Sequence, residues 1–132
     1  MNATIETFLA SPAFGVVGAS ADRSKYGNKV LQCYLQKGKR VVPVNPKEKE
    51  IEGLSCVAAV ADLPEKVQSI SVITPPRVTE QVVRDAAARG IKNIWMQPGA
   101  ESAAAVDYCR QHNINVIADG SCILVVLGYR GH

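Results

Sequence analysis

The turn Gly18-Ala19-Ser20 has the residue types and the position of a phosphate-binding site. It follows a continuous apolar run and precedes a helical pattern, so its backbone amides can face an anion close to the start of a helix. Ser20 adds a hydroxyl donor, and Arg23 and Lys25 add positive charge where a diphosphate would lie. The segment therefore predicts a phosphate site. The alternatives are that the glycine-rich turn is only a turn and that both cations are surface charges on a loop.

A second group of polar residues follows the next apolar run, at Asn45 and Lys47. A domain that binds NAD usually has Asp or Glu at this place, where the carboxylate accepts hydrogen bonds from the ribose hydroxyls. Asn45 in place of an acid argues against NAD, and Lys47 suits a phosphate on the ribose. NADP carries such a phosphate, and so does coenzyme A (CoA) at its 3′ position. Lys47 could instead be one charge in a solvated run that ends at Glu50.

Helical and strand patterns alternate along the chain and indicate how these groups are positioned. Continuous apolar strands joined by helices are typical of a parallel sheet with right-handed crossovers. We therefore predict a doubly wound, Rossmann-like α/β fold of three layers. The strand that contains Pro43 should lie near an edge or have a weak neighbour, because proline donates no ladder hydrogen bond. Leu35 and Val78 are among the helical residues expected to face the core. The expected strands are 14–18, 40–44, 69–74, 93–96 and 115–118, with a short edge strand at 55–58; the expected helices are 3–10, 27–37, 77–89 and 101–112, with a helical turn at 63–65; residues 122–127 could be a helical turn or an edge strand.

The strand ends add three further segments to the candidate site. Ligands of such sheets bind at the carboxyl ends of the strands, where the strand order reverses. Thr74 and Pro75, Gln97, and Cys122 all lie beyond the ends of expected strands. The two prolines of Thr74-Pro75-Pro76 are sufficiently explained by a strand end and a helix start, although a flat prolyl wall also suits an adenine ring. For Cys122 a buried, inert thiol is favoured over a reactive one.

The composition fits one domain, residues 1–132, with a core at about 12–126. The net charge is +3, aromatic residues make up 5%, and the basic residues are scattered, which argues against a nucleic-acid partner. Four cysteines without a CxxC spacing and two histidines, His112 and His132, give no support for a metal site. We find no secretory signal and no membrane span, and therefore expect a cytoplasmic protein with free thiols.

Six short motifs, in order along the chain, resemble the small stand-alone CoA-binding proteins and the CoA-binding domain at the start of the succinyl-CoA synthetase α subunit. The likeness extends from about residue 12 to 126, and six motifs in order are far more specific than any one of them. The motifs are Val17-Gly18-Ala19-Ser20, Lys25-Tyr26-Gly27, Pro43-Val44-Asn45-Pro46, Thr74-Pro75-Pro76, Trp95-Met96-Gln97-Pro98-Gly99-Ala100 and Cys122-Ile123.

This resemblance implies CoA as the ligand and a role for each matched residue. The implied contacts are Gly18, Ala19, Ser20 and Lys25 to the diphosphate, Asn45 and Lys47 to the adenosine and its 3′-phosphate, Thr74 and Pro75 to the adenine, and Gln97 and Cys122 to the pantetheine arm. The synthetase's phosphorylated histidine belongs to a later domain, and neither His112 nor His132 matches it, so ligase chemistry is not implied. The segment Asp119-Gly120-Ser121 also differs from the Asn or Arg that is more usual in this family.

Three functions are consistent with these residues. A CoA-binding or regulatory module without its own catalysis is favoured, because no base is expected beside Cys122 or Asp119. The alternative is a small redox protein or sensor that binds NADP or NAD, and a third is a mixed disulfide between Cys122 and CoA. The expected partner is a small-molecule nucleotide, with no nucleic acid and no membrane. A protein partner or a homodimer stays open.

Overall fold

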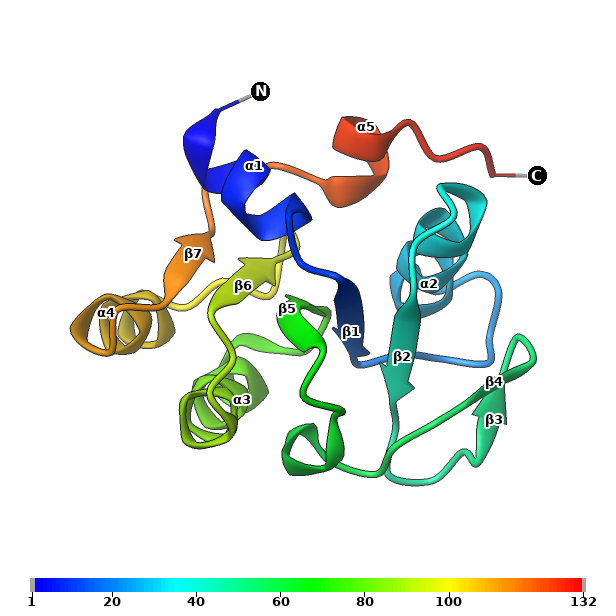
Figure 1. Ribbon diagram of the computed structural model, residues 1–132, viewed down its shortest axis with the longest axis horizontal. Coiled ribbons are helices and arrows are strands. Elements are labelled where there is room, and N and C mark those ends of the chain that lie inside the picture. Colours follow the sequence, from blue (N-terminus) through cyan, green and yellow to red (C-terminus); the bar gives the residue numbers. More distant parts are fainter. Residues whose placement is uncertain (1, 132) are drawn as a thin grey trace.

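A computed structural model describes residues 2–131 and shows a parallel sheet between helices (Figure 1). The five strands lie in the order β2-β1-β5-β6-β7, and a two-stranded antiparallel hairpin, β3-β4, accompanies them. The strands are β1 (Ala13–Val17), β2 (Val41–Val44), β3 (Glu50–Ile51), β4 (Leu54–Ser55), β5 (Val67–Val72), β6 (Asn93–Met96) and β7 (Asn115–Ile117). The helices are α1 (Ala3–Leu9), α2 (Tyr26–Gln36), α3 (Pro76–Arg89), α4 (Ala103–Gln111) and α5 (Ile123–Leu127), with a 3-10 helix η1 (Val60–Asp62).

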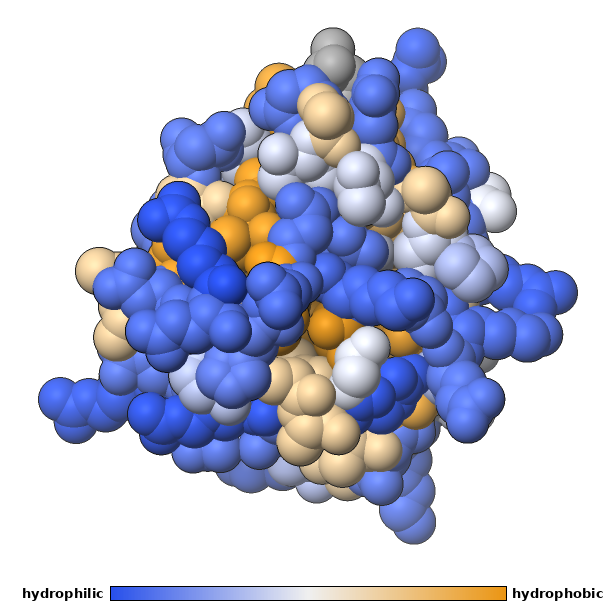
Figure 2. Space-filling model, turned by 60° about the vertical axis from the view of Figure 1, so that its left-hand side comes forward, coloured by the Kyte–Doolittle hydropathy of each residue, from blue (hydrophilic) through white to orange (hydrophobic). Residues whose placement is uncertain are grey.

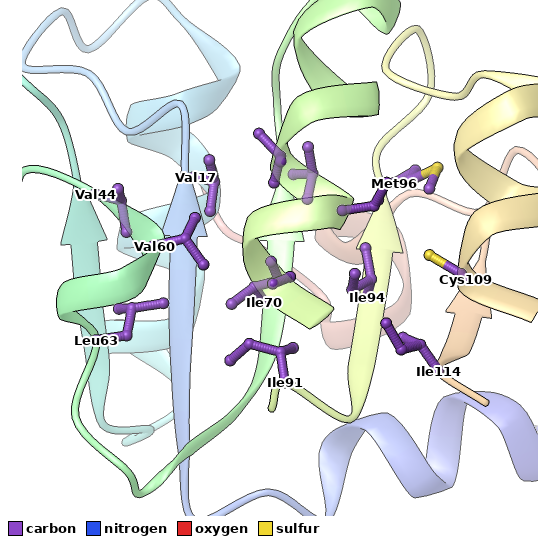
Figure 3. Close-up of a cluster of buried hydrophobic side chains, with 14 of the residues drawn as sticks. Val17, Val44, Val60, Leu63, Ile70, Ile91, Ile94, Met96, Cys109 and Ile114 are labelled. Atoms are coloured by element: carbon purple, nitrogen blue, oxygen red, sulfur yellow. The ribbon is translucent and has the colours of Figure 1, made fainter. Parts of the chain in front are cut away.

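Two separate apolar clusters, one on each face of the sheet, confirm the predicted three layers. Helices α3 and α4 cover one face together with η1, and Figure 3 shows this cluster, in which Ile70 lies near Ile91 and Ile94 lies near Cys109. Helices α1, α2 and α5 cover the other face, where Trp95 is fully buried. The strands are therefore buried on both sides, which explains why their sequences are continuous apolar runs.

The order of the strands places the candidate site. From β1 the chain runs to β2 on one side and then crosses to β5 on the other, so the strand order reverses beside β1. The register pairs Val17 with both Val44 and Val72, and Val72 with Met96. Residues that follow these four positions are consequently brought to one edge of the sheet. This is the edge at which ligands of doubly wound sheets bind.

Local signals explain where several elements end. Pro43 lies in the edge strand β2, as predicted, and its carbonyl accepts a hydrogen bond from the Val57 amide. Helix α3 ends at Gly90, whose φ of 83° is the left-handed conformation that closes many helices. Asn113 takes the same conformation between α4 and β7, with φ 56°. Gly90 and Asn113 thus each lie between a helix and the next strand of the sheet.

Some local predictions differ from the structure. Leu35 and Val78 are 39% and 47% exposed. Leu35 lies in the last turn of α2, while Val78 lies in the first turn of α3, beside the strand ends. The predicted strand at 55–58 is the hairpin strand β4 followed by a single bridge from Val57 to β2. The helical turn expected at 63–65 lies earlier, as η1, and residues 122–127 contain the helix α5.

The surface is mostly polar on the side of α4 and β7. Figure 2 brings this side forward and shows apolar atoms only in small areas between hydrophilic side chains. Within residues 2–131, no helix has the length and apolar character needed to cross a membrane.

Candidate functional site

The turn after β1 has a backbone shape that requires glycine at two places. Gly18 has a φ of 91°, and a Cβ there would lie 2.2 Å from the Ile73 carbonyl oxygen. A Cβ on Gly27, in the first turn of α2, would lie 2.0 Å from the Gly18 carbonyl oxygen. Both distances are far below van der Waals contact, so a side chain at either position would displace backbone atoms. The turn is thus fitted closely between β5 and the start of α2.

Two asparagine side chains hold the carbonyl groups of this turn. Asn45 Nδ2 donates to the Ala19 oxygen at 2.9 Å, and Asn28 Nδ2 donates to the Ser20 oxygen at 2.9 Å. Asn45 Oδ1 in turn accepts hydrogen bonds from the amides of Lys47 and Glu48, at 2.7 and 2.9 Å. Because the Ala19 and Ser20 carbonyls are bonded to these side chains, the backbone amides of the turn are the polar groups that it can offer to an anion.

The loop from Ser20 to Lys25 is braced by short-range hydrogen bonds. Ser20 Oγ accepts from the Asp22 amide at 3.1 Å, which leaves the hydroxyl proton free to donate. The Asp22 carboxylate accepts from both the hydroxyl and the amide of Ser24, and these bonds lower the pKa of Asp22. Lys25 is the N-cap of α2 and its side chain is exposed. A cation therefore stands at the helix start, where the helix dipole also favours an anion.

Arg23 makes a different contact from the one expected. Its guanidinium binds the Glu52 carboxylate at both oxygens, at 3.0 and 3.1 Å. Glu52 lies in the tight turn of the β3-β4 hairpin and also accepts a hydrogen bond from Asn28 at 3.0 Å. These contacts lower the pKa of the Glu52 carboxyl, the Arg23 hydrogen bonds being the largest cause. Arg23 lies near the turn but is paired within the protein.

A groove of about 280 Å³ opens beside the turn, between the strand ends and α3. Its walls are mainly small and apolar, and Val78 is exposed there, which accounts for its unexpected position. Thr74 lies in the groove and its hydroxyl is bound to the buried Thr79 hydroxyl at 2.7 Å. Pro75, the N-cap of α3, is exposed next to Thr74. On the other side, Pro46 lines the groove and is followed by the exposed Lys47. The lining residues are Val17, Gly18, Ala19, Val44, Asn45, Pro46, Ala58, Ala59, Val60, Thr74, Val78, Val82 and Asp85.

Gln97 and Cys122 form a second part of the same edge. Gln97 is 3% exposed; its Oε1 accepts from the Ile123 amide at 2.8 Å, and its Nε2 donates to Cys122 Sγ at 3.3 Å. Trp95 Nε1 donates to the Ser121 carbonyl at 2.9 Å. The Asp119 carboxylate accepts from the Ser121 amide, and its pKa is lowered through hydrogen bonds with Ser121. The segment before α5 is thereby fixed over the end of β6, with Cys122 partly exposed.

Other titratable groups lie elsewhere. His112 is the C-cap of α4, at the opposite edge of the sheet, and His132 lies outside the described residues. Among residues 2–131, no group of three His, Cys, Asp or Glu side chains could hold a metal ion. Burial raises the pKa of Cys109 to about 11, and burial is also the largest cause that raises the pKa of Cys33 to about 11.

The sequence analysis assigned no role to three residues that support the turn, Gly27, Asn28 and Glu52, although Gly27 belongs to one of the matched motifs. A polar Asn28 within the buried face of an amphipathic helix was an available signal, because such a side chain needs a partner. Glu52-Gly53 between apolar residues was a hairpin signal of the same kind. Neither pattern predicts that Asn28 and Glu52 contact each other, because the two residues are 24 positions apart in the sequence.

This chain is similar to one part of longer ligases and to nearly the whole of some small solved structures. Acetate–CoA ligase (ADP-forming) II subunit alpha of Pyrococcus furiosus is 26% identical over 91 residues, which are 68% of this chain and 20% of that protein. Acetate–CoA ligase (ADP-forming) I of Archaeoglobus fulgidus is 29% identical over 88 residues, 67% of this chain and 13% of that protein. The chain thus spans a fifth or less of the length of these curated relatives.

Solved structures match over nearly whole chains. A conserved hypothetical protein of Pyrococcus furiosus has a TM-score of 0.83 and 41% identity, covering 86% of this chain and 97% of that one. A protein of Thermus thermophilus has a TM-score of 0.85 and 28% identity, covering 95% and 96%. The family model described as CoA binding domain matches residues 13–128, from the first residue of β1 to just beyond α5. This chain therefore belongs to the CoA binding domain family.

Proposed function

We propose that the chain is a single-domain module that binds coenzyme A, or an acyl-CoA, at the carboxyl edge of its sheet, and that it catalyses no reaction of its own. One observation carries the proposal: a turn in which the Ala19 and Ser20 carbonyls are bonded to protein side chains lies against an apolar groove. CoA joins an anionic diphosphate to an apolar adenine ring, so its two halves fit the two neighbouring features. The curated relatives are named acetate–CoA ligases, which supports the same ligand.

The diphosphate is assigned to the turn Gly18-Ala19-Ser20. Its amides and the Ser20 hydroxyl are donors, and Lys25 at the start of α2 supplies charge. A few charge-assisted hydrogen bonds of about 1.5–3 kcal/mol each are enough for micromolar affinity after the costs of ordering. Arg23 joins this set when it leaves Glu52.

The adenosine is assigned to the groove beside the turn. Thr74, Pro75 and Val78 form its α3 side, and an exposed valine beside a proline offers an apolar face for a ring. Asn45 is engaged with Ala19 and with two backbone amides, so it serves to fix the turn and the Pro46-Lys47 segment. Lys47 at the rim is assigned to the 3′-phosphate.

The pantetheine arm is assigned to the part of the edge formed by Gln97 and Cys122. Both are held in place by bonds to the segment before α5. The thiol end of the ligand would then reach toward Cys122. No catalytic step is assigned, because His112 lies at the other edge of the sheet.

The substitution Lys47→Ala tests the assignment of the 3′-phosphate. Isothermal titration should show that the dissociation constant for CoA rises about five- to thirtyfold, the value of one exposed charge-assisted contact, while that for dephospho-CoA stays within about twofold. Lys49→Ala is the matched control, because it removes the same charge two residues away and should leave both constants nearly unchanged. Equal losses for both ligands on Lys47→Ala would disprove the contact. Tighter binding of NADP than of CoA by the wild-type protein would favour the alternative function.

A further inference from the structure

Glu52 occupies a backbone conformation that its residue type disfavours. Its φ is 51°, and it precedes Gly53 in the turn between β3 and β4. In a two-residue hairpin turn, left-handed positions are usually taken by Asn, Asp or Gly. The hairpin is anchored independently of Glu52, since Ile51 is 2% exposed and packs with Leu54 in the α2-side core. A strained glutamate in an anchored hairpin suggests that its side chain has a specific task.

The side chain of Glu52 links the phosphate turn to Arg23. Three consecutive hydrogen bonds, of 2.9, 3.0 and 3.1 Å, lead from the Ser20 carbonyl through the Asn28 amide and the Glu52 carboxylate to the Arg23 guanidinium. Arg23 is therefore within reach of an anion that lies at the turn. The Asn28 Nδ2 group donates one hydrogen bond to the Ser20 carbonyl and one to the Glu52 carboxylate. Glu52 therefore also keeps the Asn28 amide oriented toward the turn.

The Arg23–Glu52 pair is well suited to exchange. A guanidinium binds a carboxylate and a phosphate with the same two-pronged geometry. The Arg23 side chain is 75% exposed whereas that of Glu52 is 17% exposed, so the arginine can move and the glutamate cannot easily follow. Exposed ion pairs contribute only about 0–1 kcal/mol, so a diphosphate can displace the carboxylate at low cost.

We propose that Glu52 is a specificity-determining and positioning residue of the phosphate site, because it holds Arg23 until a ligand with a diphosphate displaces it. The carboxylate stands in for the ligand's phosphate on Arg23 and lowers the affinity of the turn for weaker anions. A ligand with two adjacent phosphates supplies enough charge to take over the guanidinium, whereas a single phosphate or a carboxylate does not. This inference rests on the proposed binding of CoA at the turn.

The substitution Glu52→Gln tests this exchange. The glutamine can still accept a hydrogen bond from Asn28, but it no longer binds Arg23 as an ion pair, so Arg23 is free for the ligand. Titration calorimetry at low salt should give a dissociation constant for CoA about three- to fivefold below that of the wild type, as expected when one exposed pair worth up to about 1 kcal/mol no longer competes. Inorganic phosphate, which does not displace the carboxylate in the wild type, should gain by a larger factor than CoA, and the preference for the diphosphate should therefore fall. Glu50→Gln, with the same charge change at an exposed position of the hairpin, should stay within about twofold of wild type for CoA.

A double variant separates exchange from a general effect of charge. Arg23→Ala in the Glu52→Gln background should abolish the gain, because no guanidinium is then available. A gain that persists without Arg23, or a Glu52→Gln protein that is folded by circular dichroism and binds CoA no better than wild type, would overturn the inference while leaving CoA binding intact. Binding of CoA to neither protein would overturn the proposed function and the inference with it.

A measurement on the wild-type protein gives a second test that needs no change at Glu52. The ¹⁵N resonance of Arg23 Nε, assigned by comparison with Arg23→Lys, should shift on saturation with CoA and stay in place on saturation with pantetheine, which has no diphosphate. An Nε resonance that does not move when CoA is bound would contradict the exchange.

Discussion

The substitution Gly27→Ala should separate the fit of the phosphate turn from the stability of its helix. Gly27 lies in the first turn of α2 and its φ is outside the left-handed range, so alanine suits the local helix. Alanine is favoured over glycine in a helix by about 1 kcal/mol. The added Cβ, however, would lie 2.0 Å from the Gly18 carbonyl oxygen. That oxygen, and the turn with it, must move by about 1–1.5 Å to restore ordinary contact.

The two effects oppose each other in stability, whereas only the displacement of the turn affects binding. Overpacking against a backbone atom costs about 1–3 kcal/mol, so the helix gain is cancelled and the free energy of unfolding should fall by about 0–2 kcal/mol. Displacement by an ångström weakens each hydrogen bond from the turn amides to a phosphate, which are worth about 1.5–3 kcal/mol each. We therefore expect the dissociation constant for CoA to rise at least about tenfold.

Gly90→Ala is the matched control for this experiment. Gly90 has a φ of 83° and no atom within 4 Å of an added Cβ, and it ends α3 at the edge opposite the turn. This substitution should lower the free energy of unfolding by about 1 kcal/mol through backbone strain alone and leave CoA affinity unchanged. Urea unfolding and titration calorimetry measure the two quantities. If Gly27→Ala keeps wild-type affinity while folded, the turn does not position the ligand as inferred.

Three further predictions concern the cysteines and the buried polar network at the other edge of the sheet. At pH 8, iodoacetamide should label Cys122 in the native protein well before Cys33 and Cys109, whose burial raises their pKa to about 11; equal labelling rates would refute the burial. Because those thiols ionise at about 9 when unfolded, their contribution to stability is complete below pH 9 and is lost as the pH rises toward 11, which urea midpoints across that range will measure. Asn93→Ala should lower the free energy of unfolding by about 1–3 kcal/mol, since Asn93 bonds Ser69 and Asn115 in the buried network at the other edge, and CoA affinity should not change.

The fold could be predicted because its signals are local. Continuous apolar strands, amphipathic helices and left-handed residues such as Gly90 and Asn113 each act within a few residues, and together they specify a parallel sheet. The exposure of Val78 was not predicted, because it depends on where the helix lies in the fold and not on a local signal. Its helical spacing is that of a core residue, but its place in the first turn of α3 puts it beside the strand ends.

The candidate site could be predicted only in part. The segments that carry it follow from the rule that strand ends form the ligand edge, and Gly18, Asn45, Thr74 and Gln97 do lie at that edge. The partners of the polar side chains could not be derived, because they depend on contacts across the fold. Arg23 and Glu52 are 29 residues apart, and Glu52 is brought to the turn by a hairpin that the sequence analysis did not identify.

Titration calorimetry of the wild-type protein with CoA and with NADP tests the proposed ligand most directly. Both ligands carry adenosine, a diphosphate and a phosphate on the ribose, so the comparison isolates the 3′ position and the pantetheine arm that Lys47, Gln97 and Cys122 are proposed to contact. We predict micromolar binding of CoA and at least about tenfold weaker binding of NADP. NADP that binds as tightly as CoA, or an absence of CoA binding, would contradict the assignment of this site to coenzyme A.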